Sequence, residues 1–273
     1  LSPGQRLPQV TLGRPDEHEL ETGEIRPLAR ITGASNIAFL VDVRHDGTGL
    51  AVFKPEAGER PLWDFPDGTL ARRERAAYLV SRTGGWGLVP PTVLRDGPGG
   101  PGSLQTWIGD RTAPAPAVVD LDVVDEVPDD HLGIVVGEDE GGADVVVHHR
   151  DDPRLRSLAV LDAALNPSDR KAGHVLASDE GIHAIDNAVS LHVDPKLRTV
   201  LWAWAGQPLP EPDARKLETL AAALERDGLR DELGTLLTVP EIAALEDRVN
   251  ALLACGVHPA PTDGWPPLPW PPA

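Results

Sequence analysis

Residues 161–193 constrain the fold most, because short apolar runs alternate there with aspartates and three histidines. Apolar residues recur at helical spacing up to Asn166, and Pro167 follows, so we expect a helix that ends at this point. Two short strands are expected at 174–177 and 182–186, joined by a Gly-containing turn. A helix, a polar loop and a hairpin in this order can direct several acidic and imidazole side chains to one point.

Charge and cysteine content exclude several classes of function. Lys and Arg number 25 against 43 Asp and Glu, which gives a net charge of −18. Such a chain repels phosphate backbones and anionic lipid, so we expect no nucleic-acid partner. No apolar run is long enough to span a membrane, so we expect no membrane insertion. The expected substrate is a small molecule or a protein/peptide. Cys255 is the single cysteine, which excludes an internal disulfide and a Cys-based zinc cluster. Without a membrane-span run or a signal-peptide pattern, the expected localisation is cytoplasmic.

The order of strands and helices predicts an α+β chain with two lobes. Residues 1–109 are expected to form a strand-rich N-terminal lobe with one helix, which begins near Thr69 and ends near Ser81. Residues 110–273 are expected to form a mainly helical lobe that ends in a Pro/Trp tail. Its first part, 110–152, holds 13 acidic residues and is predicted to be an insert or lid with a single strand at 144–148.

Four polar residues follow one another in an order that suits phosphoryl transfer. Lys54 ends a strand, Glu74 shares a helical stripe with apolar and small residues, Asp169 lies in the central loop, and Asp186 ends the second strand of the hairpin. A lysine can orient phosphates, a glutamate can hold the lysine, one aspartate can accept a proton and another can hold Mg²⁺. Glu74 can equally sit at the edge of its stripe beside Arg73.

Several segments of the chain have a specific sequence pattern: Ala34-Ser-Asn-Ile, Phe53-Lys-Pro, the run from Gly58 to Leu70, 166–176, Ile185-Asp-Asn and the Pro-Trp-Pro-Pro tail. Together they resemble an actinobacterial family related to phosphoinositide 3-/4-kinase-like and HipA-like kinases. The resemblance implies a two-lobed protein-kinase-like, phosphoinositide 3-/4-kinase-like fold that binds ATP and Mg²⁺. The function it implies is ATP-dependent phosphoryl transfer.

The resemblance implies a role for each residue of this chain that matches a functional residue of the family. Asp169 resembles the catalytic aspartate, and Arg170 beside it is counted with the catalytic residues. The implied cofactor contacts are Ser35 in a hairpin turn, Lys54 with its partner Glu74, and Gln105 to Ile108 as the adenine-contacting hinge. The implied metal ligands are His174, where an Asn is usual, and Asp186.

The imidazole of His174 leaves other functions open. Mg²⁺ prefers oxygen ligands, whereas two imidazoles and one carboxylate form the ligand set of non-haem Fe(II) oxygenases. An Fe(II) and 2-oxoglutarate site would need His174, Asp186 and one further histidine. The candidates for this third ligand are His192, which we assign, and His183 or His149. A third possibility is a nucleotide-binding pseudokinase, because Ala188 stands where a glycine usually follows the metal-binding aspartate.

Overall fold

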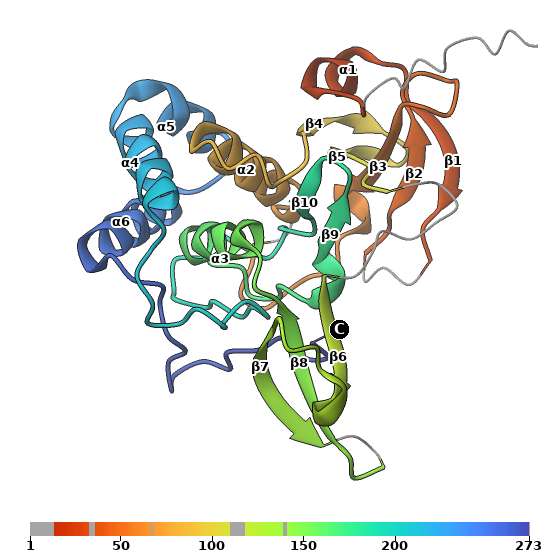
Figure 1. Cartoon of the computed structure of the whole chain (residues 1–273). Helices are drawn as coiled ribbons and strands as arrows, with labels where there is room; N and C mark the ends of the chain where they lie inside the picture. The colour runs from red at the N-terminus through yellow and green to blue at the C-terminus, as the bar shows by residue number, and fades with distance from the viewer. Residues whose placement is uncertain (1–13, 33–35, 67, 110–117, 139–140, 273) are drawn as a thin grey trace, which may run out of the picture. The chain divides into compact units, whose positions relative to one another are not determined.

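The computed structural model describes residues 14–32, 36–66, 68–109, 118–138 and 141–272 (Figure 1). They form a mixed α and β structure whose named strands all pair antiparallel. Contacts divide the chain into two compact units. Unit 1 comprises Leu1–Gly58 and Pro91–Trp107, and unit 2 comprises Glu59–Pro90 and Ile108–Ala273.

Unit 1 is a five-stranded antiparallel sheet with one short helix. The strand order is β1-β2-β3-β5-β4, and the burial of β3 alternates residue by residue, as expected where one face covers a core. That core contains the fully buried side chains of Leu20, Phe53 and Leu104. The elements are α1 (Glu17–Thr22), β1 (Arg26–Arg30), β2 (Phe39–Asp42), β3 (Leu50–Pro55), η1 (Glu56–Gly58), β4 (Thr92–Gly97) and β5 (Gly100–Thr106).

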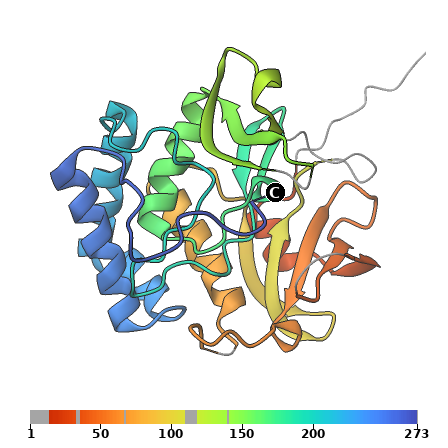
Figure 2. The ribbon, with the colours of Figure 1, turned by 90° about the horizontal axis from the view of Figure 1, so that it is seen from below.

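Unit 2 is built around α3 (Pro153–Leu165), which is buried on nearly every side. A helix that is apolar all round must lie inside a core, and α3 contacts both α2 (Leu70–Thr83) and α6 (Val239–Cys255). Figure 2 shows α4, α5 and α6 along one flank of α3. The remaining elements outside the acidic segment are η3 (Ala172–His174), β9 (Val175–Ser178), β10 (Gly181–Ala184), α4 (Glu211–Glu225) and α5 (Asp227–Gly234).

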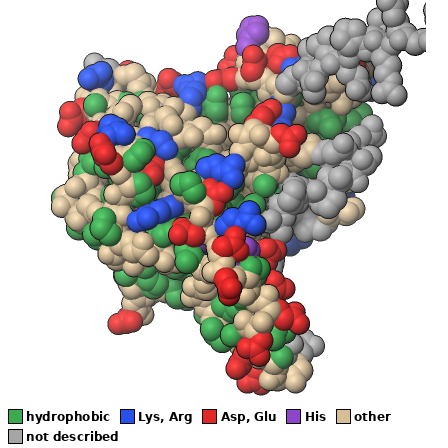
Figure 3. Space-filling model, viewed as in Figure 1, with side chains coloured by type: hydrophobic (Ala, Val, Ile, Leu, Met, Phe, Trp, Pro, Cys, Tyr) green, Lys and Arg blue, Asp and Glu red, His purple; other side chains and the backbone are tan. Residues whose placement is uncertain are grey.

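The acidic segment contains three strands instead of the single strand expected. They are β6 (Val119–Val123), β7 (His131–Glu138) and β8 (Asp144–Arg150), in the order β6-β8-β7, with η2 (Val124–Glu126) after β6. Buried Val119 and Val147 join the main core of unit 2, which anchors the sheet. Figure 3 shows acidic side chains over its outer part. The residues of β7 and β8 do not alternate regularly, whereas β6, Val-Asp-Leu-Asp-Val, does alternate, and this signal was missed.

The division of the chain also differs from the predicted lobes. The helix expected within the N-terminal lobe is α2, and its residues cluster with unit 2, because one face of α2 packs on α3, α4 and α5. No helix among the described residues is long and apolar enough to cross a membrane.

Candidate active site

The candidate site begins where α3 ends. Asn166 caps the helix in a left-handed conformation with φ of 56°, and its backbone N–H donates to the carbonyl of Asp162 at 2.7 Å. Asparagine tolerates this conformation better than most residues, and Pro167 cannot continue the helix. The side chain of Asn166 accepts a hydrogen bond from the Lys196 N–H at 2.8 Å and donates to the Asp194 carbonyl at 2.8 Å. The predicted helix end is therefore confirmed, and the loop that follows has a fixed starting point.

Arg170 holds this loop from inside the protein. Its guanidinium donates to Asp162 at 3.0 Å, to the Ile185 carbonyl at 2.7 Å and to the Asn187 side chain at 2.6 Å. The side chains of Arg170 and Asp162 are both 0% exposed, and Thr199 donates a further hydrogen bond to Asp162 at 3.1 Å. The prediction of a catalytic Arg170 is corrected accordingly. Its hydrogen bonds are made to buried groups of the protein, so it positions the two loops on either side of the hairpin.

Sequence reasoning missed the partners of Arg170. Asp162 lies on the same helical face as Leu155 and Leu158, and a carboxylate on an apolar face signals a buried cation. That signal was available from the sequence. Asn187 belongs to the Ile185-Asp-Asn segment but was given no role there, and Thr199 carried no comparable signal.

Glu74 supports the same region from α2. It is 2% exposed, and its carboxylate accepts a hydrogen bond from the Asn187 backbone N–H at 3.0 Å. This bond fixes the residue directly after Asp186. Lys54, its predicted partner, lies on β3 in unit 1 and is half-buried, and the pairing of the two stays a prediction.

His174 and Asp186 face each other at the centre of the site. The Nδ1 of His174 lies 2.9 Å from the Asp169 carbonyl, which can only accept, so Nδ1 carries the proton. The Nε2 then points a lone pair toward the Asp186 carboxylate, 3.3 Å away. Burial lowers the pKa of His174, against the opposing effect of Asp186, so a proton between the two groups is disfavoured at neutral pH.

This arrangement fits a divalent metal ion. A ligating histidine usually donates its other ring N–H to a carbonyl or carboxylate, which is the role that Asp169 plays for His174. Asp186 has a φ of 57° and a side chain that is 45% exposed, so its carboxylate is held in an uncommon backbone conformation and is open to solvent. Asp169 is likewise accessible, with a 37% exposed side chain and Lys171 at 3.6 Å.

The structure places His192, the predicted third ligand, elsewhere. Its Nε2 donates to the Asp64 carbonyl at 3.0 Å, and its Nδ1 accepts from the Asp194 N–H at 2.9 Å. The Nδ1 of His149 lies 2.8 Å from the Arg150 carbonyl and its ring packs against Trp204, while its Nε2 is buried without a hydrogen-bond partner among the described residues. His183 lies 2.9 Å from the Ser178 hydroxyl. Within the described ranges, no three His, Cys, Asp or Glu side chains gather as a metal site. The His192 assignment is therefore corrected, because both of its ring nitrogens are already used.

The predicted cofactor residues have different outcomes. Ser35 lies outside the described residues. Gln105 lies on β5, between β3 and β4, and its buried side chain donates to Thr92 at 2.9 Å. This hydrogen bond holds the side chain inside the sheet of unit 1, and the hinge role of Gln105 stays a prediction. Ile108 is 5% exposed and is the first residue of unit 2 after the boundary.

Comparison with known proteins identifies a relative over nearly the whole chain. No protein-family model matches. The sequence is 45% identical over 268 residues to protein Rv2133c of Mycobacterium tuberculosis strain H37Rv, covering 94% of this chain and 96% of that protein. The chain belongs to the Rv2133c family. The expected relationship to an actinobacterial family is confirmed by this relative.

A solved structure is similar at a greater distance. The proinflammatory kinase CtkA of Helicobacter pylori matches with a TM-score of 0.46 and 12% identity, over 86% of this chain and 93% of that one. This similarity is too low to assign a fold or an activity to the Rv2133c family.

Proposed function

We propose that the protein is a metal-dependent phosphotransferase of kinase-like fold that uses ATP as donor. The observation that carries this proposal is the arrangement of three residues: the Asp169 carbonyl orients His174, and Nε2 of His174 faces Asp186 at 3.3 Å. The carboxylate of Asp169 remains accessible to accept a proton from the acceptor group.

The number of protein ligands favours a site completed by phosphates. Mg²⁺ is usually held by one or two carboxylates, with substrate phosphates and water supplying the other oxygens. His174 and Asp186 would hold the ion, which would neutralise charge on the transferred phosphoryl group when bound. Asp169 would hold the proton that leaves the acceptor. Arg170 and Glu74 would keep the two loops in place through Asn187.

The order of residues along the chain supports the same class of reaction. Lys54 precedes Glu74, Asp169 and Asp186, as a phosphate-orienting lysine precedes its partner and the two catalytic aspartates in kinases.

An Fe(II) and 2-oxoglutarate oxygenase is the second candidate, and the imidazole of His174 favours it. Iron accepts imidazole more readily than Mg²⁺ does. Such a site takes two histidines and one carboxylate, and the described residues bring His174 and Asp186 together without the third ligand. The two-ligand arrangement is therefore better explained by a nucleotide site.

Calorimetric titration of ATP, with Mg²⁺ or Mn²⁺ and with the metal left out, tests the proposal. We expect metal-dependent ATP binding and ADP formation in the wild type. Asp186→Asn should weaken metal–ATP binding by about tenfold or more, and Asp169→Asn should retain binding while ADP formation falls by about a hundredfold. Lys54→Ala should weaken binding with and without metal.

Two further variants sharpen the test. Asp179→Asn changes an exposed aspartate in the β9–β10 turn and should leave binding and turnover unchanged. His174→Asn should preserve or raise ADP formation in a phosphotransferase and should abolish iron binding in an oxygenase. ATP binding without ADP formation would indicate a pseudokinase. Tight Fe²⁺ binding with 2-oxoglutarate turnover, and no ATP binding, would contradict the proposal.

A further inference from the structure

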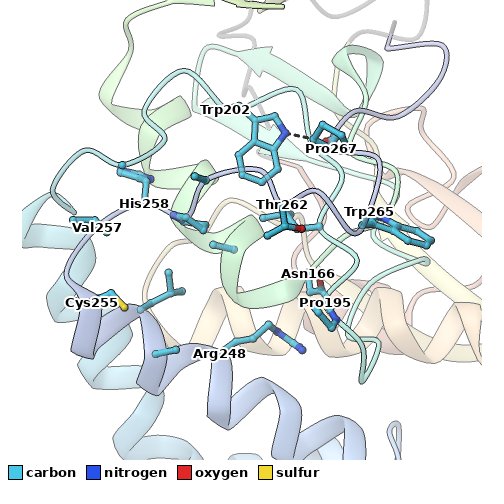
Figure 4. Close-up of a pocket in the computed structure, with 17 residues that line it drawn as sticks. Asn166, Pro195, Trp202, Arg248, Cys255, Val257, His258, Thr262, Trp265 and Pro267 are labelled. Carbon is cyan, nitrogen blue, oxygen red and sulfur yellow. Dashed lines mark hydrogen bonds between the residues drawn. The ribbon is translucent and has the colours of Figure 1, made fainter.

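A cavity of about 400 Å³ lies in unit 2, beneath the C-terminal tail 256–272 (Figure 4). Its walls are predominantly apolar and come from the end of α3, from α6, from residues 195–206 and from the tail. This volume lies within the range that holds small molecules. The Trp202 indole donates to the Pro267 carbonyl at 2.8 Å, which ties the tail to the cavity wall.

Two hydrogen-bond donors that line this cavity have no partner among the described residues. One is Nη2 of Arg248 on α6, and the other is the indole N–H of Trp265 in the tail. Both atoms are buried. A buried donor without a partner costs free energy, and native proteins leave few of them. Two such donors around one cavity point to a ligand that accepts hydrogen bonds.

The rest of the Arg248 guanidinium is held in place. Its Nε donates to the Ala164 carbonyl at 2.9 Å, and its Nη1 donates to the His192 carbonyl at 3.1 Å. These bonds orient the guanidinium and leave Nη2 for another acceptor. The Ala164 and His192 carbonyls therefore fix the position of the guanidinium, as in a preorganised binding site.

The charge of Arg248 is only partly offset by a neighbouring carboxylate. Burial lowers the pKa of Arg248 to about 10, although Asp247 opposes the shift. No carboxylate of the described residues forms an ion pair with this guanidinium.

Arg248 is the one Lys or Arg among the described residues that line the cavity. Lys196 and Arg198 lie over the Trp265 ring but outside this lining. Lys196 is also paired with Asp64. One unpaired cation in an apolar cavity suits a single negative charge, because a dianionic phosphate would remain half neutralised.

We propose that this cavity binds a small monocarboxylate with an apolar body. The carboxylate would accept from Nη2 of Arg248 and from the Trp265 indole, and the apolar body would cover Trp202, Leu252 and Leu197. A hydrogen bond between a guanidinium and a carboxylate is among the stronger ones in proteins. The proposed ligand is separate from the nucleotide of the candidate active site.

Calorimetric titration of the full chain with octanoate tests this site, with octanamide as a neutral probe of matched size. We expect octanoate to bind, and octanamide to bind about tenfold or more weakly, because it lacks the charge that Arg248 would pair. Trp265→Phe removes the indole N–H donor together with part of the aromatic ring and should weaken octanoate binding several-fold. Arg248→Gln should weaken it by about tenfold or more.

Matched controls separate binding from folding. Trp270→Phe changes another tail tryptophan, which is 83% exposed and outside the cavity lining, and should leave octanoate binding unchanged. Arg215→Gln changes an exposed arginine on α4 and should also have no effect. Circular dichroism shows whether each variant is folded. If Arg248→Gln does not fold, the octanoate affinity of Trp265→Phe tests the proposal by itself. Absent octanoate binding at millimolar concentration, equal binding of octanamide, or unchanged binding by Trp265→Phe would each overturn the proposal.

Discussion

Arg170 shows how one buried residue can determine the geometry of a site without touching a substrate. It joins Asp162 on α3 to the Ile185 carbonyl and the Asn187 side chain, on either side of Asp186. Its neighbour Asp169 has an accessible carboxylate. Adjacent residues of one loop therefore have different roles, one inside the core and one at the surface.

Removing Arg170 should destabilise the protein strongly. Arg170→Met leaves the Asp162 carboxylate buried without a counter-charge, so we expect the free energy of unfolding to fall by about 3–5 kcal/mol in urea denaturation. Arg170→Met combined with Asp162→Leu should recover part of this loss, because no charge then remains buried. Arg215→Met, which removes an exposed ion pair on α4, should cost no more than about 0.5 kcal/mol. A similar small loss for Arg170→Met would refute the supporting role.

At the scale of elements, α3 connects the acidic sheet to the candidate site. Its N-cap is Asp152, whose side chain accepts a hydrogen bond from the Arg154 N–H at 2.7 Å, and Pro153 occupies the first turn. Its C-cap is Asn166, which begins the loop that carries Asp169. Both ends of the helix are therefore specified by local chemistry.

Substitution of the N-cap tests this view of α3. Asp152→Ala should lower the free energy of unfolding by about 1 kcal/mol, because one N–H of the first turn loses its acceptor. Asp152→Asn keeps a capping oxygen and should stay within about 0.5 kcal/mol of the wild type. Thermal and urea unfolding of the two variants provide the measurement. Equal losses for both would mean that the carboxylate charge beside Arg154 matters more than the cap.

At the scale of the whole molecule, buried histidines should make stability depend on pH. Burial lowers the pKa of His149, His174 and His258, and that of His258 falls to about 4. The unfolded chain takes up protons near pH 6.5, whereas the folded chain resists protonation, so the free energy of unfolding decreases as the pH falls below about 6.5. Protonation of His258 alone would cost on the order of 3 kcal/mol once the pH reaches about 4.

Urea denaturation between pH 7.5 and pH 5.5 measures how the free energy of unfolding depends on pH, in a range above the pKa of most carboxylates. We expect stability to fall over this interval by about 1 kcal/mol for His258. His258→Gln removes the titrating group and should reduce the slope. An unchanged slope in His258→Gln would contradict the assignment.

The sequence by itself determined the local parts of the candidate site. The end of α3 at Asn166, the β9–β10 hairpin and the approach of His174 to Asp186 all depend on residues close together in the chain. Helical spacing, Pro167 and the glycine of the turn are short-range signals, so they could be read without a structure.

Only the tertiary structure decided which charged and aromatic side chains make their hydrogen bonds inside the protein and which keep an unpaired donor. The hydrogen bond from Arg170 to Asn187 was not indicated by local spacing, and the exclusion of His192 depends on the Asp64 carbonyl, 128 residues away. The unpartnered donors of Arg248 and Trp265 became visible only when the tail was seen to close the cavity. The physical reason is that a polar group in a core is satisfied by whatever the fold brings within hydrogen-bond distance, and local pattern does not specify those distant partners.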